Sequence, residues 1–349
     1  MRTKLYPLVG VFALATVAST AQAISFNPFV TSTDLATSVG NTAAIGFAYA
    51  GDKFVGSVYY GTNNNQLYTS NLTGGSLATF GAPIPGFSGE IYVSSSLGIG
   101  GYGPRDIFAG SEAAGTVVRI AHDGSSQGNF VTGLQGGVRS LAFDPYGLYG
   151  NQMIVATNQG KIYQVSNTGT ATLLANVGED AEGLSFTPQN FGGYAKGTLF
   201  VASEGSGVLR AITPGGTVTT AVTGLPGAEM VSFVPLNLGS SGNPVEGFYA
   251  ASYPQNVIKA PASDFTPYIG DAVVTSETSG SVYRVHWNGS AFDNSVIGHF
   301  PAQPEDGIFV TADVIKPPIP EPEVWAMALA GLLVLPFSRR WRRARRQAD

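Results

Sequence analysis

The chain between residues 24 and 314 is a succession of short apolar stretches separated by turns of glycine, asparagine and serine. Three segments, 107–120, 199–210 and 273–285, closely resemble one another: each has an apolar stretch, a Ser-Glu pair, and a second apolar stretch that contains one arginine. Convincing helical periodicity is absent from this region. The pattern therefore predicts a β-hairpin that recurs along the chain.

A further short strand precedes the hairpins, at residues 138–143, 182–186 and 229–233, and other strands follow them. The first four hairpin turns fall near residues 63, 113, 158 and 205. Four short strands repeated every 40–50 residues or so are typical of a propeller blade, which buries its two faces only by stacking on its neighbours. We therefore predict an all-β fold, a β-propeller of five or six four-stranded blades.

The number of blades stays open at this point. Counting hairpins gives six, but residues 248–285 offer too little chain for two complete blades. Residues 236–271 could instead form an insertion in a fifth blade, and the strand that begins at Asp306 could close the ring against the N-terminal strands. A β-sandwich and a β-solenoid are the alternative folds.

The first 23 residues have the organisation of a secretory signal peptide. Arg2 and Lys4 form a charged start, residues 8–17 form an apolar core, and Ala21 and Ala23 flank a glutamine in a small-residue cleavage site. Signal peptidase would then remove residues 1–23, and the mature chain would be exported.

The last residues combine three features in a fixed order. Prolines and glutamates occupy residues 317–323, an apolar run of 14 residues follows at 324–337, and six arginines end the pattern. The run is shorter than the roughly 20 residues of a typical membrane-spanning helix, although snorkelling side chains at its end extend it. We expect a short transmembrane helix at 324–337 whose basic end stays on the cytoplasmic side. The arginines are Arg339, Arg340, Arg342, Arg343, Arg345 and Arg346.

This C-terminal segment resembles the PEP-CTERM sorting signal of Gram-negative bacteria. The resemblance covers residues 317–346 and includes Pro320, Glu321 and Pro322, the apolar run and the arginines, whereas Glu323 departs from the small polar residue that is more common there. It implies that exosortase, a membrane protease-transpeptidase, processes an inner-membrane-tethered chain near the Pro-Glu-Pro, often in bacteria that make exopolysaccharide. The chain is thus divided into a signal peptide (1–23), a β-propeller domain (24–314) and a sorting and anchor segment (315–349) with an arginine-rich tail (339–346).

Composition agrees with an exported domain that does not bind nucleic acid. The chain has no cysteine, which excludes thiol catalysis and cysteine-ligated metal sites. Residues 24–338 contain 22 acidic and ten basic residues, a formal charge of −12, and the basic residues form no stripe. Such an acidic surface favours solubility and attracts divalent cations.

Residues that open the innermost strands of a propeller face its central channel. Here the pattern places Glu90, Arg139, Glu182, Glu229, Glu305 and Asp306 at such positions. Carboxylates gathered round one axis can hold a calcium ion, which takes six to eight oxygen ligands. The domain is similar in plan to NHL and gluconolactonase-like propellers. In gluconolactonase-like and paraoxonase-like propellers a channel calcium polarises the substrate carbonyl, and the resemblance implies Glu182 and Asp306 as the most natural ligands. The candidate ligands are Glu182, Glu229 and Asp306; capping of strand ends or pairing with Arg139 is the alternative.

The repeated Ser-Glu pairs suggest a structural role. Each glutamate is followed by an arginine on the next strand, so we expect cross-strand ion pairs. The expected pairs are Glu112 with Arg119, Glu204 with Arg210, and Glu277 with Arg284.

No catalytic residue is assigned, because the three histidines, His122, His286 and His299, lack the spacing of metal ligands. The favoured interpretation is an exported, non-enzymatic propeller at the cell surface or in the extracellular matrix, with a binding or matrix-structural role and with exopolysaccharide or a surface protein as its partner. Two alternatives stay open: a calcium-dependent lactonase or hydrolase with its site in the channel, and a scaffold that docks protein partners.

Overall fold

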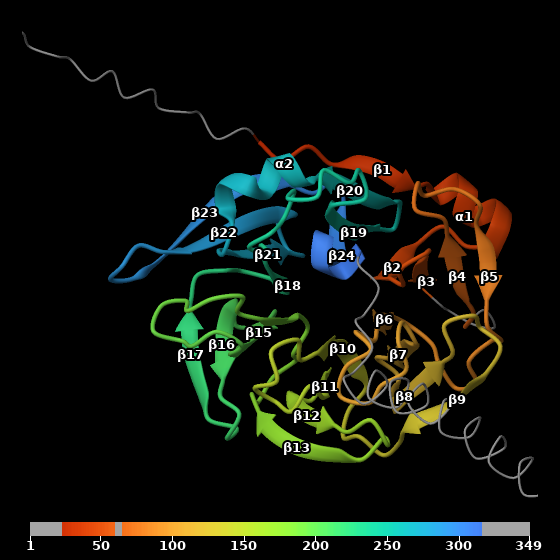
Figure 1. Cartoon of the computed structure of the whole chain (residues 1–349), viewed down its shortest axis with the longest axis horizontal. Coiled ribbons are helices and arrows are strands. Elements are labelled where there is room, and N and C mark those ends of the chain that lie inside the picture. Colours follow the sequence, from red (N-terminus) through yellow and green to blue (C-terminus); the bar gives the residue numbers. More distant parts are fainter. Residues whose placement is uncertain (1–22, 60–64, 316–349) are drawn as a thin grey trace, which may run out of the picture.

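The repeated short strands form six four-stranded antiparallel sheets around a central axis (Figure 1). The computed structural model describes residues 23–59 and 65–315. The predicted all-β propeller is therefore confirmed, and its blade number is six. The alternative folds, a sandwich and a solenoid, are excluded.

Four blades are built from consecutive strands, with the first strand of each innermost. The first contains β2 (Ala44–Tyr49), β3 (Phe54–Val58), β4 (Leu67–Ser70) and β5 (Ala78–Phe80). The second contains β6 (Ile91–Ser95), β7 (Ile107–Ser111), β8 (Ala114–Ile120) and β9 (Gln127–Val131). The third contains β10 (Val138–Phe143), β11 (Met153–Thr157), β12 (Lys161–Val165) and β13 (Ala171–Asn176). The fourth contains β14 (Leu184–Phe186), β15 (Leu199–Ser203), β16 (Val208–Ile212) and β17 (Val218–Val222).

The fifth and sixth blades are interleaved in sequence. The fifth contains β18 (Ala228–Phe233), β21 (Ala272–Ser276), β22 (Ser281–Trp287) and β23 (Phe292–His299). Between β18 and β21 the chain crosses to the sixth blade and forms β19 (Gly247–Tyr253) and β20 (Val257–Pro261), then α2 (Ala262–Phe265) and the short 3-10 helix η1 (Thr266–Tyr268). Residues 236–271 thus interrupt the fifth blade as expected, but they supply the two middle strands of the sixth.

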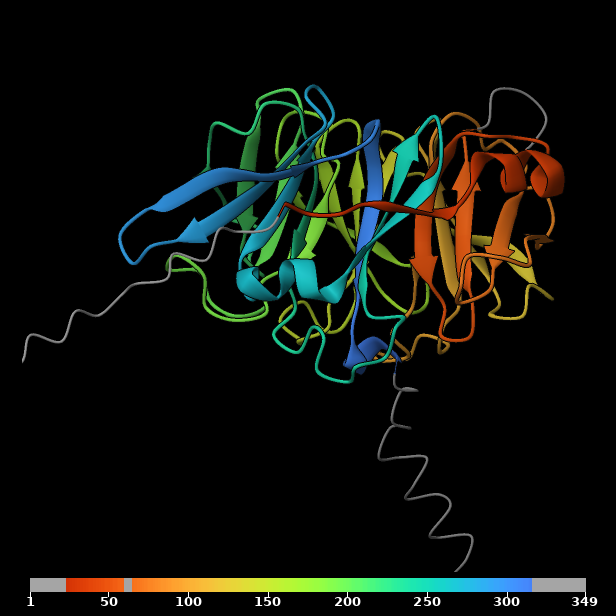
Figure 2. The ribbon, with the colours of Figure 1, turned by 90° about the horizontal axis from the view of Figure 1, so that it is seen from above.

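The two ends of the domain close the ring by joining this same blade. The last strand, β24 (Gln303–Val310), pairs with β19, and the first strand, β1 (Asn27–Val30), pairs with β20 through Asn27 and Lys259. β24 also packs beside β2, so the expected closure by the strand around Asp306 is confirmed. After β1, helix α1 (Ser32–Val39) leads to β2; after β24, the short helix α3 (Ala312–Ile315) lies at one end of the channel (Figure 2).

Buried tyrosines join neighbouring blades in a repeated way. Tyr102 lies between the first two strands of the second blade; its hydroxyl donates to the Val165 carbonyl and accepts the Met153 N–H at 3.1 Å, both in the third blade. Tyr149 makes the same pair of bonds one blade further on, donating to Ile212 and accepting from Leu199 at 3.0 Å. Burial raises the pKa of both phenols to about 12, which keeps them neutral donors at physiological pH.

The predicted export signals fall almost entirely outside the described residues. This holds for Ala21, for Pro320, Glu321 and Pro322, for the apolar run 324–337 and for the arginines. Of the residues that are described, none belongs to a helix long and apolar enough to cross a membrane.

We expect Tyr149→Phe to reduce the free energy of unfolding by about 1–3 kcal/mol, because it leaves the Leu199 N–H and the Ile212 carbonyl of the next blade without a shared partner. Tyr146→Phe is the matched control, since the Tyr146 ring is 40% exposed, and it should change stability by less than about 0.5 kcal/mol. Urea unfolding followed by circular dichroism measures both; equal stability of the two variants would show that the tyrosine bridge contributes nothing.

Candidate functional site

The innermost strands of the blades begin at the same end of the channel, and most of them begin with a charged residue. Glu90 precedes β6, Arg139 lies in β10, Glu182 precedes β14, Glu229 lies in β18, and Glu305 lies in β24. Glu112, Glu204 and Glu277, which follow the second strands of blades two, four and five, meet them there. Together with Asp180, these residues are called the acidic mouth.

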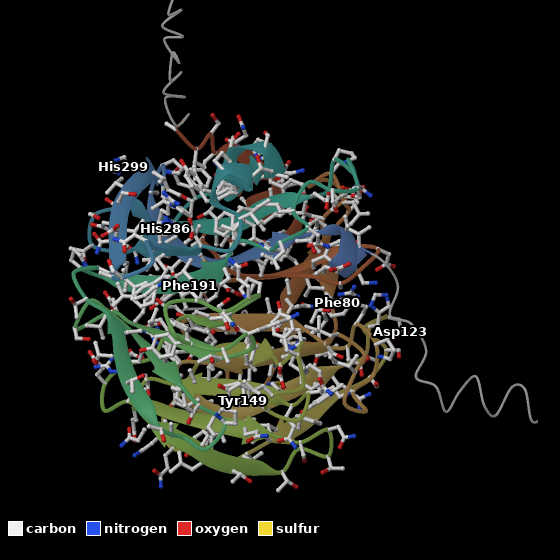
Figure 3. All side chains as sticks on the ribbon, turned by 60° about the vertical axis from the view of Figure 1, so that its left-hand side comes forward. Phe80, Asp123, Tyr149, Phe191, His286 and His299 are labelled. Atoms are coloured by element: carbon white, nitrogen blue, oxygen red, sulfur yellow. The ribbon has the colours of Figure 1, made fainter. Side chains whose placement is uncertain are left out.

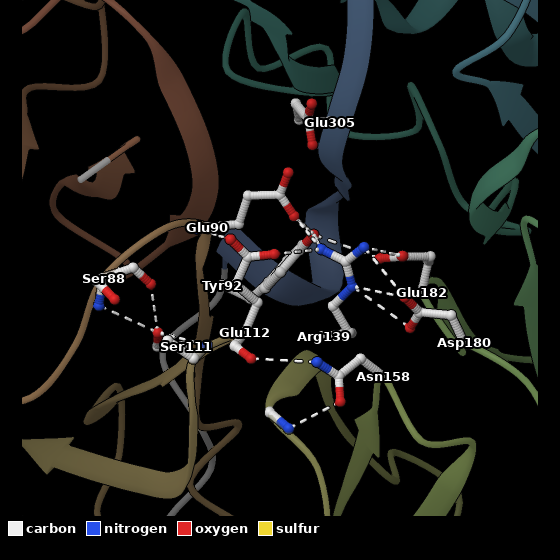
Figure 4. A network of polar contacts seen from close by, with 12 residues as sticks. Ser88, Glu90, Tyr92, Ser111, Glu112, Arg139, Asn158, Asp180, Glu182 and Glu305 are labelled. Atoms are coloured by element: carbon white, nitrogen blue, oxygen red, sulfur yellow. Dashed lines mark hydrogen bonds and ion pairs between the residues drawn. The ribbon is translucent and has the colours of Figure 1, made fainter. Parts of the chain in front are cut away.

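Arg139 is the centre of one half of the acidic mouth. Its guanidinium forms ion pairs with Glu90, with Glu112 at 3.2 Å, with Asp180 at 3.2 Å and with Glu182 at 2.6 Å. Figure 4 shows the side chain between Glu90 and Glu112 on one side and Asp180 and Glu182 on the other. The planar guanidinium has five N–H donors in a fixed fork, so it can serve several carboxylates at once.

The other half of the acidic mouth has no such cation among the described residues. Carboxylate oxygens of Glu182, Glu204 and Glu229 lie within 4.8 Å of one another. Beside them, the side-chain amide of Gln303 donates to Glu277 and, at 3.0 Å, to Glu305. In this half, four carboxylates have no basic partner among the described residues, and the neutral amide of Gln303 is their neighbour. The four are Glu204, Glu229, Glu277 and Glu305.

Close backbone approach brings the carboxylates of blades four and five together. Gly183 follows Glu182, and a Cβ at this position would collide with the backbone of Met230 and Val231 in β18. The absence of a side chain lets the start of β14 approach β18, which places Glu182 beside Glu229. Both carboxylates are buried, with relative exposures of 3% and 5%.

Burial and like charge favour the neutral form of these acids. Burial, and then the neighbouring Glu229, raises the pKa of Glu182 well above its usual range; burial, and then Glu305, does the same for Glu229. The pKa of Glu305 is also raised, mainly by burial, and that of Glu277 is raised to about 8 by burial and by Glu204. In the absence of a bound cation, this half of the mouth therefore retains protons at neutral pH.

A cavity of about 290 Å³ extends from the acidic mouth along the channel. Tyr92, Arg139, Glu182 and Glu229 line it near the mouth, and Asp306 lines it further along β24. At the far end, the Arg105 guanidinium lies 5.5 Å from the centre of the Tyr49 ring and donates to the Val314 carbonyl of α3. The two ends of the channel are therefore chemically different.

The structure brings together two of the three predicted metal ligands. Glu182 and Glu229 meet, but the third member of their group is Glu204. Asp306 follows Glu305 in a strand, so its side chain points elsewhere, and its Oδ2 accepts the Phe47 N–H at 3.3 Å. Burial raises the pKa of Asp306 to about 7. The repeated glutamate after the second strand of several blades was the feature of the sequence that could have identified Glu204 as a site residue. From the sequence alone, this repeat is interpreted as structural.

The prediction that Glu112, Glu204 and Glu277 form cross-strand ion pairs is wrong. Arg119 pairs instead with Asp106 and Arg284 with Asp271, at 2.7 and 2.6 Å, while Arg210 pairs with Glu179. The register explains the difference: Arg119 lies opposite Phe108, two residues after Asp106, whereas Glu112 is four residues further along, about 13 Å away. These three arginines thus pair with other carboxylates, and Glu112, Glu204 and Glu277 lie in the acidic mouth instead.

The histidines lie outside this site. The His122 Nε2 is 3.2 Å from Asp52, and the His286 Nδ1 is 2.8 Å from Asp271. His286 and His299 belong to the two outer strands of the fifth blade (Figure 3). Among the described residues, the polar side chains that line the cavity are carboxylates, serines, two tyrosines and two arginines, without an imidazole.

Comparison with known proteins supports the fold alone. No protein-family model matches the sequence, and no curated protein matches it. Among solved structures, the chain is similar to one in the nidogen/laminin complex, with a TM-score of 0.52, 14% identity, and coverage of 76% of this chain and 84% of the other. It is also similar to a catalytically inactive virginiamycin B lyase from Staphylococcus aureus with quinupristin, with a TM-score of 0.50, 11% identity, and coverage of 80% and 75%. Since one is a protein complex and the other a lyase, this likeness leaves the choice between binding and catalysis to the site itself.

Without divalent cations, we expect the unfolding temperature to fall as the pH rises from about 5 to about 8. The pKa of Glu277 is about 8 in the folded chain against an ordinary value of 4.5, so the folded state binds more protons than the unfolded state in this window. Stability contributed by the bound proton is therefore lost as the pH rises through the folded pKa. Glu277→Gln should flatten the profile.

Glu179→Gln is the matched control for this measurement. Although burial opposes the shift, Ser206 and Arg210 lower the pKa of Glu179, so its contribution to stability is present above its ordinary pKa and has the opposite sign. Thermal unfolding in a chelator measures both profiles. A wild-type unfolding temperature that is constant from pH 5 to 8 would contradict the expectation.

Proposed function

We propose that this chain is an exported β-propeller, delivered to the cell surface or the extracellular matrix by its C-terminal sorting segment, and that it acts there by binding rather than by catalysis. The observation that carries this proposal is that all six four-stranded blades lie between the two predicted signals, from Asn27 to Val310. The partners that suit the proposal are exopolysaccharide and surface proteins.

The fold begins directly after the predicted signal-peptide cleavage site. Ile24 is 7% exposed and donates its N–H to the Ile297 carbonyl at 3.3 Å, and the Ser25 N–H donates to Asp264 at 2.8 Å. At the other end, α3 ends at Ile315, just before the proline-rich segment. Removal of residues 1–23 and processing near Pro320 would therefore leave every strand of the propeller in place.

The position of α3 also supports an orientation for the domain. β24 begins at the acidic mouth, where it carries Gln303 and Glu305, and runs along the channel to α3 at the opposite end (Figure 2). An anchor attached after Ile315 would hold that opposite end towards the membrane. The acidic mouth would then face away from the membrane, where an external ligand can reach it.

The chemistry of the channel favours binding. Ser95, Ser140 and Ser185 line the cavity, but no described residue there offers an imidazole base that would activate a hydroxyl. Crowded carboxylates are instead suited to a cation or to the hydroxyl groups of a polar ligand. An excess of buried negative charge favours positively charged ligands over neutral or negative ones. Such selection is a property of binding and needs no chemical reaction.

A calcium-dependent lactonase or hydrolase is the second candidate. It is favoured by one observation, namely that Glu182 and Glu229 open directly into a cavity of about 290 Å³ that could receive a small substrate beside a metal ion. Hydrolysis of simple lactones by the purified chain in calcium, abolished by Glu229→Gln, would support it over the binding role.

We expect the protein recovered from its native host to lack residues 1–23 and to be cut near Pro320, as measured by intact mass. A chain that lacks residues 317–349 should still be exported but should no longer be retained at the surface. Replacement of Pro320 and Glu321 by alanine should block processing and leave the chain in the inner membrane. Unchanged surface delivery of the truncated chain would refute the sorting proposal.

A further inference from the structure

We propose that the acidic mouth contains a binding site for a divalent cation of the calcium class, held between Glu182, Glu204 and Glu229. The inference names a ligand for the proposed binding role and rests on that role. The three glutamates come from three places: two residues before β14, directly after β15, and within β18. The fold of blades four and five is therefore what assembles the site.

The separation of the carboxylates suits such an ion. Their oxygens lie within 4.8 Å of one another. Calcium–oxygen bonds are about 2.3–2.6 Å long, so two oxygens on opposite sides of one ion are separated by at most about 5 Å. The three groups can therefore contact a single ion, and their oxygen ligands favour calcium or magnesium over softer metals.

Glu229 gives independent evidence for a ligand. Glu229 is 5% exposed. Among the described residues, no hydrogen bond or ion pair reaches its carboxylate, and Arg139 acts on it only as a more distant charge. Two other buried acids of this domain have partners: Asp144 accepts backbone N–H groups from Tyr149 at 2.7 Å and from Tyr146 at 2.9 Å, and Asp271 pairs with Arg284. A buried carboxylate without a partner is costly, so this position calls for a cation.

Arg139 forms no ion pair with Glu229 and only opposes, from a distance, the rise that burial causes in the pKa of Glu229. Its guanidinium is already shared among Glu90, Glu112, Asp180 and Glu182, and at Glu182 it reaches Oε1 at 2.6 Å. It thereby positions Glu182 at the edge of the trio without contacting Glu204 or Glu229. Glu277 and Glu305, which lie next to the trio, add further negative charge and increase the attraction for a divalent ion.

The test is calorimetric titration of the chelator-treated full chain with calcium chloride and, separately, with magnesium chloride. We expect a single site that prefers calcium, and a rise in unfolding temperature on addition of the metal. Glu229→Gln and Glu204→Gln should each weaken calcium binding about 100-fold or more, because they remove a charged ligand. Glu179→Gln is the matched control: it removes a carboxylate that pairs with Arg210 outside the trio, and it should leave calcium affinity unchanged.

The unfolding temperature separates a ligand from a purely structural residue. In the absence of metal, Glu229→Gln should be at least as stable as the wild type, because the amide replaces a buried carboxyl group with a neutral group of the same shape that needs no proton or cation. Calcium should no longer stabilise this variant. The proposal is overturned if calcium up to about 10⁻³ M, the weak end of extracellular calcium sites, produces neither heat nor stabilisation. It is also overturned if Glu229→Gln folds and binds calcium as the wild type does. Export and processing are measured separately by intact mass, so failure of the sorting proposal is distinguishable from failure of this one.

Discussion

The closure of the ring is the constraint on which the rest of the structure depends. β1 and β24, from opposite ends of the domain, complete one blade with the hairpin of β19 and β20 between them. The closed ring holds the innermost strands of all six blades around one axis, and their first residues meet at one end of it. Without closure, the edges of the first and last blades would be exposed, and the charged residues that open the strands would not converge.

Convergence on the axis concentrates negative charge where solvent is scarce. Burial of an ion costs several kcal/mol unless a partner compensates it, and a typical domain is stable by only about 5–15 kcal/mol. Arg139 compensates the carboxylates of one half of the acidic mouth, whereas Gln303 offers the other half only a neutral amide. The tyrosine bridges and the apolar packing between blades must therefore offset an unfavourable electrostatic term. Local conflict of this kind is expected where a protein binds something.

The two ends of the channel differ in their chemistry, so the two faces of the domain are not equivalent. Arg105, Tyr49 and the carbonyl of Val314 join α3 to the end that lies opposite the carboxylates. α3, with the last described residues, lies at this end, so the proposed tether would not obstruct the acidic mouth. The proposed binding at the mouth and the proposed attachment through the C-terminal segment are thus compatible in one molecule.

The sequence by itself determined the local elements, because strand and turn preferences act over a few residues. The hairpins at 107–120 and 199–210 and the inward position of Glu182 and Glu229 were predictable from strand order and repeat alone. The tertiary structure decided the blade count, since the pairing of Asn27 with Lys259 joins segments more than 200 residues apart in the sequence. It also decided the partners of the charged side chains: register directs Arg119 to Asp106, and the approach of β14 to β18 at Gly183 brings Glu182 to Glu229, with Glu204 as the third member. Such contacts depend on which strands lie side by side, and no local pattern contains that information.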